Sequence, residues 1–192
     1  MKQLNFLLAA MVSCATCFSQ VHFGIDPGLA LSKGSYKSSV DYDRRIFAGF
    51  DGGVFLEIGV TPKFMIQPEV NYSIRGVELN NGDKEATTKL RYIDFPVLAK
   101  VAVSSKFNLY AGPQVGFLTW AKRDSSFTNE MIDLKNDFDK GDFGLVFGGE
   151  YNFTRHLFLG SRYYLGLHQI AEDWNDFEMR NRYISFRVGY KF

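Results

Sequence analysis

The sequence is poor in cysteine and histidine and has no excess of charge of either sign. Its 192 residues include 2 cysteines and 3 histidines, and 22 basic side chains are balanced by 21 acidic ones. This balance argues against a nucleic-acid-binding protein, which would show a basic excess or a basic face. A disordered chain is excluded too, because 19 Phe, 10 Tyr and 2 Trp carry more apolar area than a solvated chain exposes.

The first twenty residues have the layout of a secretory signal peptide. A lysine near the start is followed by an apolar run over residues 4–18 and then by small residues. The run is too short to cross a bilayer as a helix, which takes about 20 apolar residues, so an N-terminal anchor is the lesser alternative. We expect cleavage after Ser19 or Gln20, which leaves residues 21–192 as one mature domain.

Both cysteines, Cys14 and Cys17, lie inside this leader. The mature chain is then free of cysteine, and no disulfide, thiol nucleophile or cysteine-ligated metal can form in it. A lipid-modified Cys14 is the alternative, since Ser13-Cys14 faintly resembles a lipoprotein cleavage site. The strand-like sequence starts so soon afterwards that little tether would remain.

The mature chain lacks any run of about 18 or more apolar residues, so a membrane-embedded form must be a closed barrel of strands. Alternation of apolar and polar side chains over about ten residues is the signature of such strands. It is clearest in two segments, whose apolar positions are Phe64, Ile66, Pro68, Val70, Tyr72 and Ile74, and Ile184, Phe186, Val188, Tyr190 and Phe192. Eight segments alternate in this way: 23–32, 48–58, 64–75, 92–101, 107–117, 142–153, 157–167 and 183–192.

The connections between these segments alternate between short and long. The short ones are residues 61–63, 104–106 and 154–156, and the long, polar ones are 34–45, 76–88, 119–141 and 168–181. Transmembrane barrels have tight periplasmic turns and longer extracellular loops, and an even strand number returns both termini to the periplasm. The sequence therefore predicts an all-β fold, an eight-stranded antiparallel up-and-down transmembrane β-barrel. A soluble barrel that binds an apolar ligand in its lumen is the alternative.

Four segments resemble a known family of small barrels. They are YIDFPVLAK at 92–100, LYAGPQVGF at 109–117, DFGLVFGGEY at 142–151 and the terminal ISFRVGYKF. Over essentially the whole mature chain they are similar to the PorT-like family of outer-membrane β-barrels of Gram-negative bacteria, the outer membrane protein beta-barrel domain. The resemblance implies an outer-membrane location, surrounding outer-membrane lipid and, through Tyr190 and Phe192, recognition by the barrel-assembly machinery. Its motifs are apolar patterns, so they imply no particular activity.

The inward faces of the predicted strands carry charges of both signs. The acidic positions are Asp26, Asp51, Glu57, Glu69, Asp94 and Glu150, and the basic ones are Arg75, Lys100, Arg162, Arg187 and Lys191. An eight-stranded barrel is only wide enough for side chains to fill, and an unpaired buried charge costs several kcal/mol. We therefore expect a structural network of ion pairs that plugs the lumen, with a narrow gated ion path as the alternative. The expected core of this network is Glu57, Glu69, Arg75, Asp94, Lys100, Glu150, Arg162 and Arg187. Inward glycines should leave room for these side chains, at positions 112, 116, 144, 148, 160 and 166.

Few residues could support catalysis or hold a metal. His22, His156 and His168 are expected at strand ends, and no spacing requires any of them to meet a nucleophile, so we expect no catalytic triad. The aspartates of loop 119–141 suggest a calcium-binding site. However, Gly141 stands at the wrong offset and no bidentate glutamate closes the loop. We expect no enzymatic activity, no cofactor and no bound metal.

The long loops are the remaining place for function. Trp174 and Phe177 of the fourth loop, and Asp137 and Asp139 of the third, are the candidate contacts. We expect a non-enzymatic outer-membrane barrel with a loop-mediated role in binding, adhesion or membrane organisation, and with an extracellular or secretion partner but no nucleic acid. A component of a protein-secretion or transport assembly is the alternative, with its contacts on the lipid-facing or periplasmic surface.

Overall fold

The computed structural model describes residues 21–32, 35–36, 43–80, 85–125, 131–133, 138–170 and 179–192. The expected signal peptide, residues 1–20, lies outside these ranges, as do the candidate contacts Trp174, Phe177 and Asp137. The described residues include no helix that is long and apolar enough to cross a membrane.

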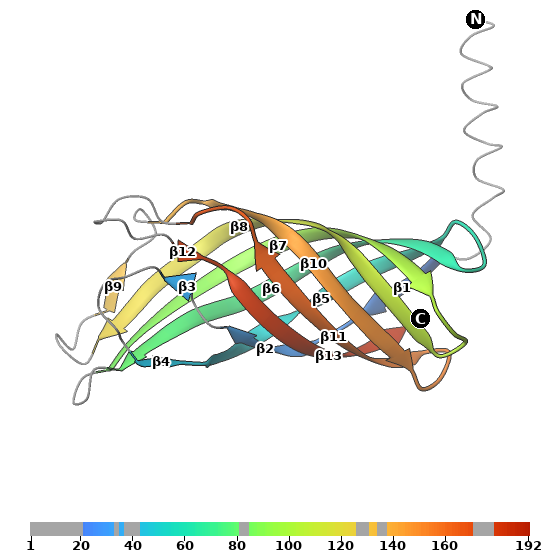
Figure 1. The fold of residues 1–192 in the computed structure, drawn as a ribbon, viewed down its shortest axis with the longest axis horizontal. Helices are drawn as coiled ribbons and strands as arrows, with labels where there is room; N and C mark the ends of the chain where they lie inside the picture. The colour runs from blue at the N-terminus through green and yellow to red at the C-terminus, as the bar shows by residue number, and fades with distance from the viewer. Residues whose placement is uncertain are drawn as a thin grey trace, which may run out of the picture.

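The described part of the chain forms an antiparallel barrel (Figure 1). Its strands are β1 (Val21–Ile25), β2 (Gly28–Ser32), β3 (Ser35–Tyr36), β4 (Asp43–Arg45), β5 (Phe47–Gly59), β6 (Phe64–Asn80), β7 (Glu85–Ala102), β8 (Phe107–Ser125), β9 (Met131–Asp133), β10 (Gly141–Asn152), β11 (Leu157–Gly166), β12 (Met179–Arg180) and β13 (Arg182–Lys191). The long strands pair in the order β5, β6, β7, β8, β10, β11, β13, and both β5 and β13 pair with β1 and β2, which closes the ring. β1 and β2 together occupy one strand position, between β5 and β13. With the seven long strands this makes eight, and the prediction of an eight-stranded barrel is confirmed. The short strands β3, β4, β9 and β12 lie at the end opposite the C-terminus (Figure 1).

The first strand of the barrel is interrupted between β1 and β2, where the sequence predicts one continuous strand over residues 23–32. Pro27 has no N–H to donate to a ladder. The backbone makes isolated bonds there: the Asp26 N–H donates to Gly53 O, and the Val188 N–H donates to Pro27 O, each over 3.0 Å. The break leaves Asp26 buried in the lumen.

Burial alternates along the strands as the sequence pattern predicts. In β13 exposed and buried positions alternate without exception. The exposed positions carry large apolar side chains, among them Val97, Val115, Phe147, Leu159, Phe186 and Val188. A surface that is apolar outside and charged inside suits hydrocarbon and not water, which counts against the soluble barrel.

Inward aromatic rings lie over glycines of neighbouring strands. The directly paired residues are Gly24 with Phe55, Gly148 with Tyr110, and Gly189 with Phe158. In each pair a Cβ on the glycine would overlap the ring. These glycines therefore make the space that lets large side chains share a narrow lumen, a use that the sequence predicts for Gly148.

The three short turns share one hydrogen-bond pattern. Each begins with a hydroxyl residue, Thr61, Ser104 or Thr154. Its side-chain oxygen accepts bonds from the backbone N–H groups two and three residues on, at 2.9–3.3 Å. Such a side chain satisfies the turn's backbone locally, so these connections stay short, as predicted.

The barrel wall continues past the predicted strand ends, and the expected loop over 76–88 is wrong in extent. β6 and β7 stay paired out to Asn80 and Glu85, and β8 follows β7 as far as Ser125. Beyond the hydrocarbon a strand needs no apolar face, so the alternation ends while the pairing goes on. The polar segments that resemble loops are in part an extension of the wall.

The C-terminus closes the barrel at the end that holds the short turns (Figure 1). The Phe192 N–H donates to Phe23 O over 2.8 Å, and the two rings stack with centroids 5.6 Å apart. Tyr190 stacks on His156 at the same distance. Tyr190 and Phe192, the expected assembly signal, are both exposed on the outer wall.

We predict that Gly189→Ala destabilises the barrel by about 1–3 kcal/mol, because the added methyl group would overlap the Phe158 ring that packs beside Lys191. Urea unfolding in lipid vesicles measures the change. Gly141→Ala is the matched control, since a Cβ there meets nothing within 4 Å, and it should shift stability by less than about 0.5 kcal/mol. Equal stabilities of the two variants would contradict the role given to Gly189.

Candidate functional site

The lumen holds a network of buried charges. Its acids are Asp26, Asp51, Glu57, Glu69, Asp94, Asp142 and Glu150, and its bases are Arg75, Lys100, Arg162, Arg187 and Lys191. All eight residues of the expected core network are among them. They form three clusters along the barrel, here called the turn-side, the middle and the loop-side cluster.

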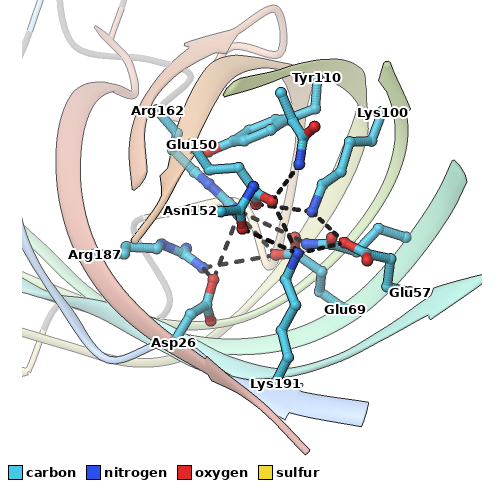
Figure 2. A network of polar contacts seen from close by, with 12 residues as sticks. Asp26, Glu57, Glu69, Lys100, Tyr110, Glu150, Asn152, Arg162, Arg187 and Lys191 are labelled. Atoms are coloured by element: carbon cyan, nitrogen blue, oxygen red, sulfur yellow. Dashed lines mark hydrogen bonds and ion pairs between the residues drawn. The ribbon is translucent and has the colours of Figure 1, made fainter. Parts of the chain in front are cut away.

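In the turn-side cluster, two lysines each contact the same two glutamates (Figure 2). Lys100 Nζ lies 2.7 Å from Glu57 Oε2 and 2.8 Å from Glu150 Oε2. Lys191 Nζ lies 3.0 Å from an oxygen of each of the same carboxylates. Asn108 adds a bond of 2.8 Å to Glu150 Oε1. The four charges cancel, and each of them is paired within the buried lumen.

The middle cluster is built on two arginines (Figure 2). Arg162 donates two hydrogen bonds to Glu69, from Nη1 to Oε2 over 2.8 Å and from Nη2 to Oε1 over 3.0 Å. Arg187 bridges two aspartates, with Nη1 2.8 Å from Asp26 Oδ2 and Nη2 2.6 Å from Asp51 Oδ2. The planar guanidinium fork suits such bidentate and bridging contacts, which lysine cannot copy.

The loop-side cluster centres on Arg75. Its Nη2 lies 2.5 Å from Asp94 Oδ2, and its Nη1 lies 2.8 Å from Asp142 Oδ2. Asn181 also donates to Asp142 Oδ2, over 2.9 Å. Because Asp142 follows the third loop and Asn181 ends the fourth, the cluster fixes the roots of both. Three rings surround the guanidinium carbon, with centroids at 4.5 Å for Tyr92, 4.9 Å for Tyr164 and 4.6 Å for Tyr183.

Neutral polar side chains complete the network, and sequence reasoning did not assign them a role. Gln67 and Asn71 each donate to Glu69 over 2.8 Å, and Ser73 Oγ donates to Asp94 Oδ2 over 2.6 Å. The signal was present, because all three lie on the predicted wet face of residues 64–75. Their contacts satisfy carboxylate lone pairs that the arginines leave open.

The clusters tie distant walls of the barrel together. Arg187 of β13 reaches Asp51 of β5, and Lys100 of β7 lies between Glu57 of β5 and Glu150 of β10. Removing a buried ion from water costs several kcal/mol, which only good pairing offsets. The arrangement is thus suited to holding the walls and filling the lumen.

The histidines do not meet a nucleophile among the described residues. His168 Nε2 lies 3.0 Å from Asp139 Oδ2, and both side chains are about half exposed. His156 Nδ1 lies 2.8 Å from Lys191 O. In the part of the chain that the structure describes, no group of three His, Cys, Asp or Glu is placed to hold a metal. Asp139 is the one candidate loop contact that lies within the described residues. Its contact with His168 joins the third loop to the fourth.

A depression of about 650 Å³ marks the outer wall across β7, β8, β10, β11 and β13. Small side chains contribute to its lining, at Ala99, Ala111 and Ser161. Larger apolar side chains of the exposed belt surround them, among them Val101, Leu109 and Phe147. It is a feature of the lipid-facing surface.

Comparison with known proteins gives one family match. The family model described as outer membrane protein beta-barrel domain matches residues 15–172. No curated protein matches the sequence.

Several solved barrels share the fold over nearly their whole length. Neisserial surface protein A (NspA) is 17% identical with a TM-score of 0.56, over 91% of this chain and 100% of that one. Ail, the attachment invasion locus protein of Yersinia pestis, is 15% identical with a TM-score of 0.51, over 90% and 99%. OprG from Pseudomonas aeruginosa is 15% identical with a TM-score of 0.51, over 89% and 95%. At these identities the likeness shows the fold.

We predict that Lys100→Met destabilises the barrel by about 3–5 kcal/mol, because it leaves two buried carboxylates short of a cation. Adding Glu150→Gln should restore part of the loss. Urea unfolding in lipid vesicles measures both variants, with Lys106→Met in an exposed turn as the neutral control. A double variant that is destabilised by the full sum of the two single losses would contradict the coupling.

Proposed function

We propose that this chain, which belongs to the outer membrane protein beta-barrel domain family, is a non-conducting and non-enzymatic barrel that acts through its extracellular loops. The observation that carries the proposal is the lumen, which paired charges occupy from the short turns to the loop roots. A binding partner would then contact this protein at the rims of the barrel or on its outer surface, and not in the lumen. Export by the signal peptide of residues 1–20 is part of the proposal.

Conduction would require the lumen pairs to separate. An ion that passes the turn-side cluster must displace Lys100 or Lys191 from carboxylates that lie 2.7–3.0 Å away. Each charge left unpaired in so buried a site costs several kcal/mol. This cost favours a structural plug over a gated ion path.

The loop end of the barrel is built to present loops from a rigid base. Asp142 and Asn181 bind at the Arg75 cluster, and Asp139 N–H donates to Ile170 O over 2.9 Å. The extended pairing of β6, β7 and β8 carries the wall further out at the same end (Figure 1). Binding residues are commonly found on loops held by such a scaffold, and the candidates remain Trp174, Phe177, Asp137 and Asp139.

The relatives are compatible with this role. Ail is named for attachment and invasion, and its structure was solved in complex with the heparin analogue sucrose octasulfate. A barrel of this fold thus serves in attachment elsewhere. The segments at 92–100 and 109–117 support a place in the PorT-like branch of the family, and the exposed Tyr190 and Phe192 support recognition by the barrel-assembly machinery.

The test is capture of partners by the purified barrel in detergent, after cross-linking to surface and membrane extracts of the producing cell. Replacing residues 37–42, 126–137 and 171–178 by short Gly–Ser links should reduce recovery of specific partners at least about tenfold, as loss of hot-spot contacts does.

The matched control changes the other end of the barrel, with Lys63→Gln, Lys106→Gln and Arg155→Gln in the exposed turns. This variant should capture partners as the unchanged protein does. Partners that survive loop replacement but are lost from the turn variant would contradict the proposal and favour a component of a secretion or transport assembly.

A further inference from the structure

An extra residue in β8 changes which side chains face outward at the loop end. Tyr92 pairs with Leu118 and Arg91 pairs with Trp120, so Thr119 is left over as a β-bulge. The Thr119 hydroxyl donates to Arg91 O over 3.0 Å. Leu118 is buried on the inward face, and in an unbroken strand Trp120 would point inward with it. The bulge reverses the alternation and brings Trp120 opposite the exposed Arg91.

The bulge thereby assembles a group of cations around one indole on the outer wall. We call it the rim patch, and it consists of Lys89 and Arg91 of β7 and Trp120 and Lys122 of β8. Lys89 pairs with Lys122. The Arg91 guanidinium carbon lies 4.2 Å from the Trp120 ring centroid, and Lys122 Nζ lies 5.4 Å from it.

The rim patch carries more positive charge than its neighbours neutralise. Lys89 directly opposite Lys122 is a like-charge cross-strand pair, which is unfavourable. The β6 residues opposite Arg91 and Lys89 are uncharged, and β9 places one acid, Asp133, opposite Lys122. The ion pairs formed within the described ranges use other cations. Among the residues directly paired across the rim patch, three cations therefore stand against one acid.

The rim patch stands where the lipid-facing belt ends. On β7 the outward residues below it are all apolar, at Ile93, Phe95, Val97, Ala99 and Val101. At the usual rise and tilt this run covers about 20 Å of height, close to the apolar band of an outer-membrane barrel. The next outward position is Arg91, at the level where lipid headgroups and interfacial tryptophans lie.

We propose that the rim patch binds the phosphate group of an outer-leaflet lipid. An anion between Lys89 and Lys122 relieves their repulsion. The Arg91 guanidinium carbon lies over the indole, and a guanidinium stacked on a ring can still donate from its N–H edge to phosphate oxygens. A lipid phosphate suits this place better than a free one, because the lipid chains can cover the adjoining apolar belt. The site rests on the outer-membrane position of the family and is independent of the loop role.

The test is a binding titration of the purified full-length mature protein in nonionic detergent, with bound lipid counted by native mass spectrometry. The probes are diphosphoryl lipid A, the same lipid after removal of both phosphates, and inorganic phosphate. Combining Lys89→Gln, Arg91→Gln and Lys122→Gln should weaken binding of the phosphorylated lipid about a hundredfold, since each cation near an anionic lipid contributes about fivefold. Asp133→Asn should strengthen it.

Arg182→Gln is the matched control, because Arg182 is an exposed cation on the outer face of β13 at the same end. It should alter binding by less than about threefold. Equal binding of the dephosphorylated lipid, undiminished binding by the triple variant, or displacement of the lipid by equimolar inorganic phosphate would each overturn the proposal. If the triple variant does not fold, judged by its heat-dependent mobility on SDS gels, Arg91→Gln alone should show about a fivefold loss.

Discussion

Pairing of buried charge is the constraint on which the rest of this structure depends. Seven carboxylates and five cations of the described residues share the lumen of one narrow barrel, and none of them can stand alone there without a cost of several kcal/mol. Their partners lie far apart in sequence. Arg162 is 93 residues from Glu69, and Arg187 is 161 residues from Asp26. These two long-range pairs form only when the barrel closes, which links ring closure to the stability of the strands that they join.

The walls are shaped around this network. Glycines at 24, 148 and 189 leave space for aromatic rings, and these rings in turn pack beside the charges, as Phe158 does 5.2 Å from Lys191 Nζ. With polar groups turned inward, the outer surface is left to apolar side chains and suits lipid. We propose that this filled lumen leaves function to the outside of the barrel: to the loops, to the loop roots that Arg75 fixes, and to the cations at the upper edge of the belt.

Much of the fold was predictable from the sequence, because a barrel in lipid repeats one simple rule along every strand. Alternation alone is enough to place Glu69, Arg75, Lys100 and Arg187 on the inward faces. It does not reveal which acid meets which base, since that depends on the relative register of eight strands. It also fails at irregularities: Pro27 breaks the first wall, and Thr119 reverses the faces of β8. Past the hydrocarbon edge, residues 76–80 pair as strand although the outward row of Tyr72 and Ile74 continues there through the non-apolar positions 76, 78 and 80, so the pattern resembles a loop.

The central claim is that the lumen is closed by its own ion pairs. The most direct measurement is current through the purified protein in a planar lipid bilayer, recorded in concentrated KCl over both polarities. A barrel whose three clusters stay paired should insert without producing discrete conductance steps. Stable, reproducible steps from the unchanged protein would contradict the account, because they would show that ions pass a lumen in which the charges are separated.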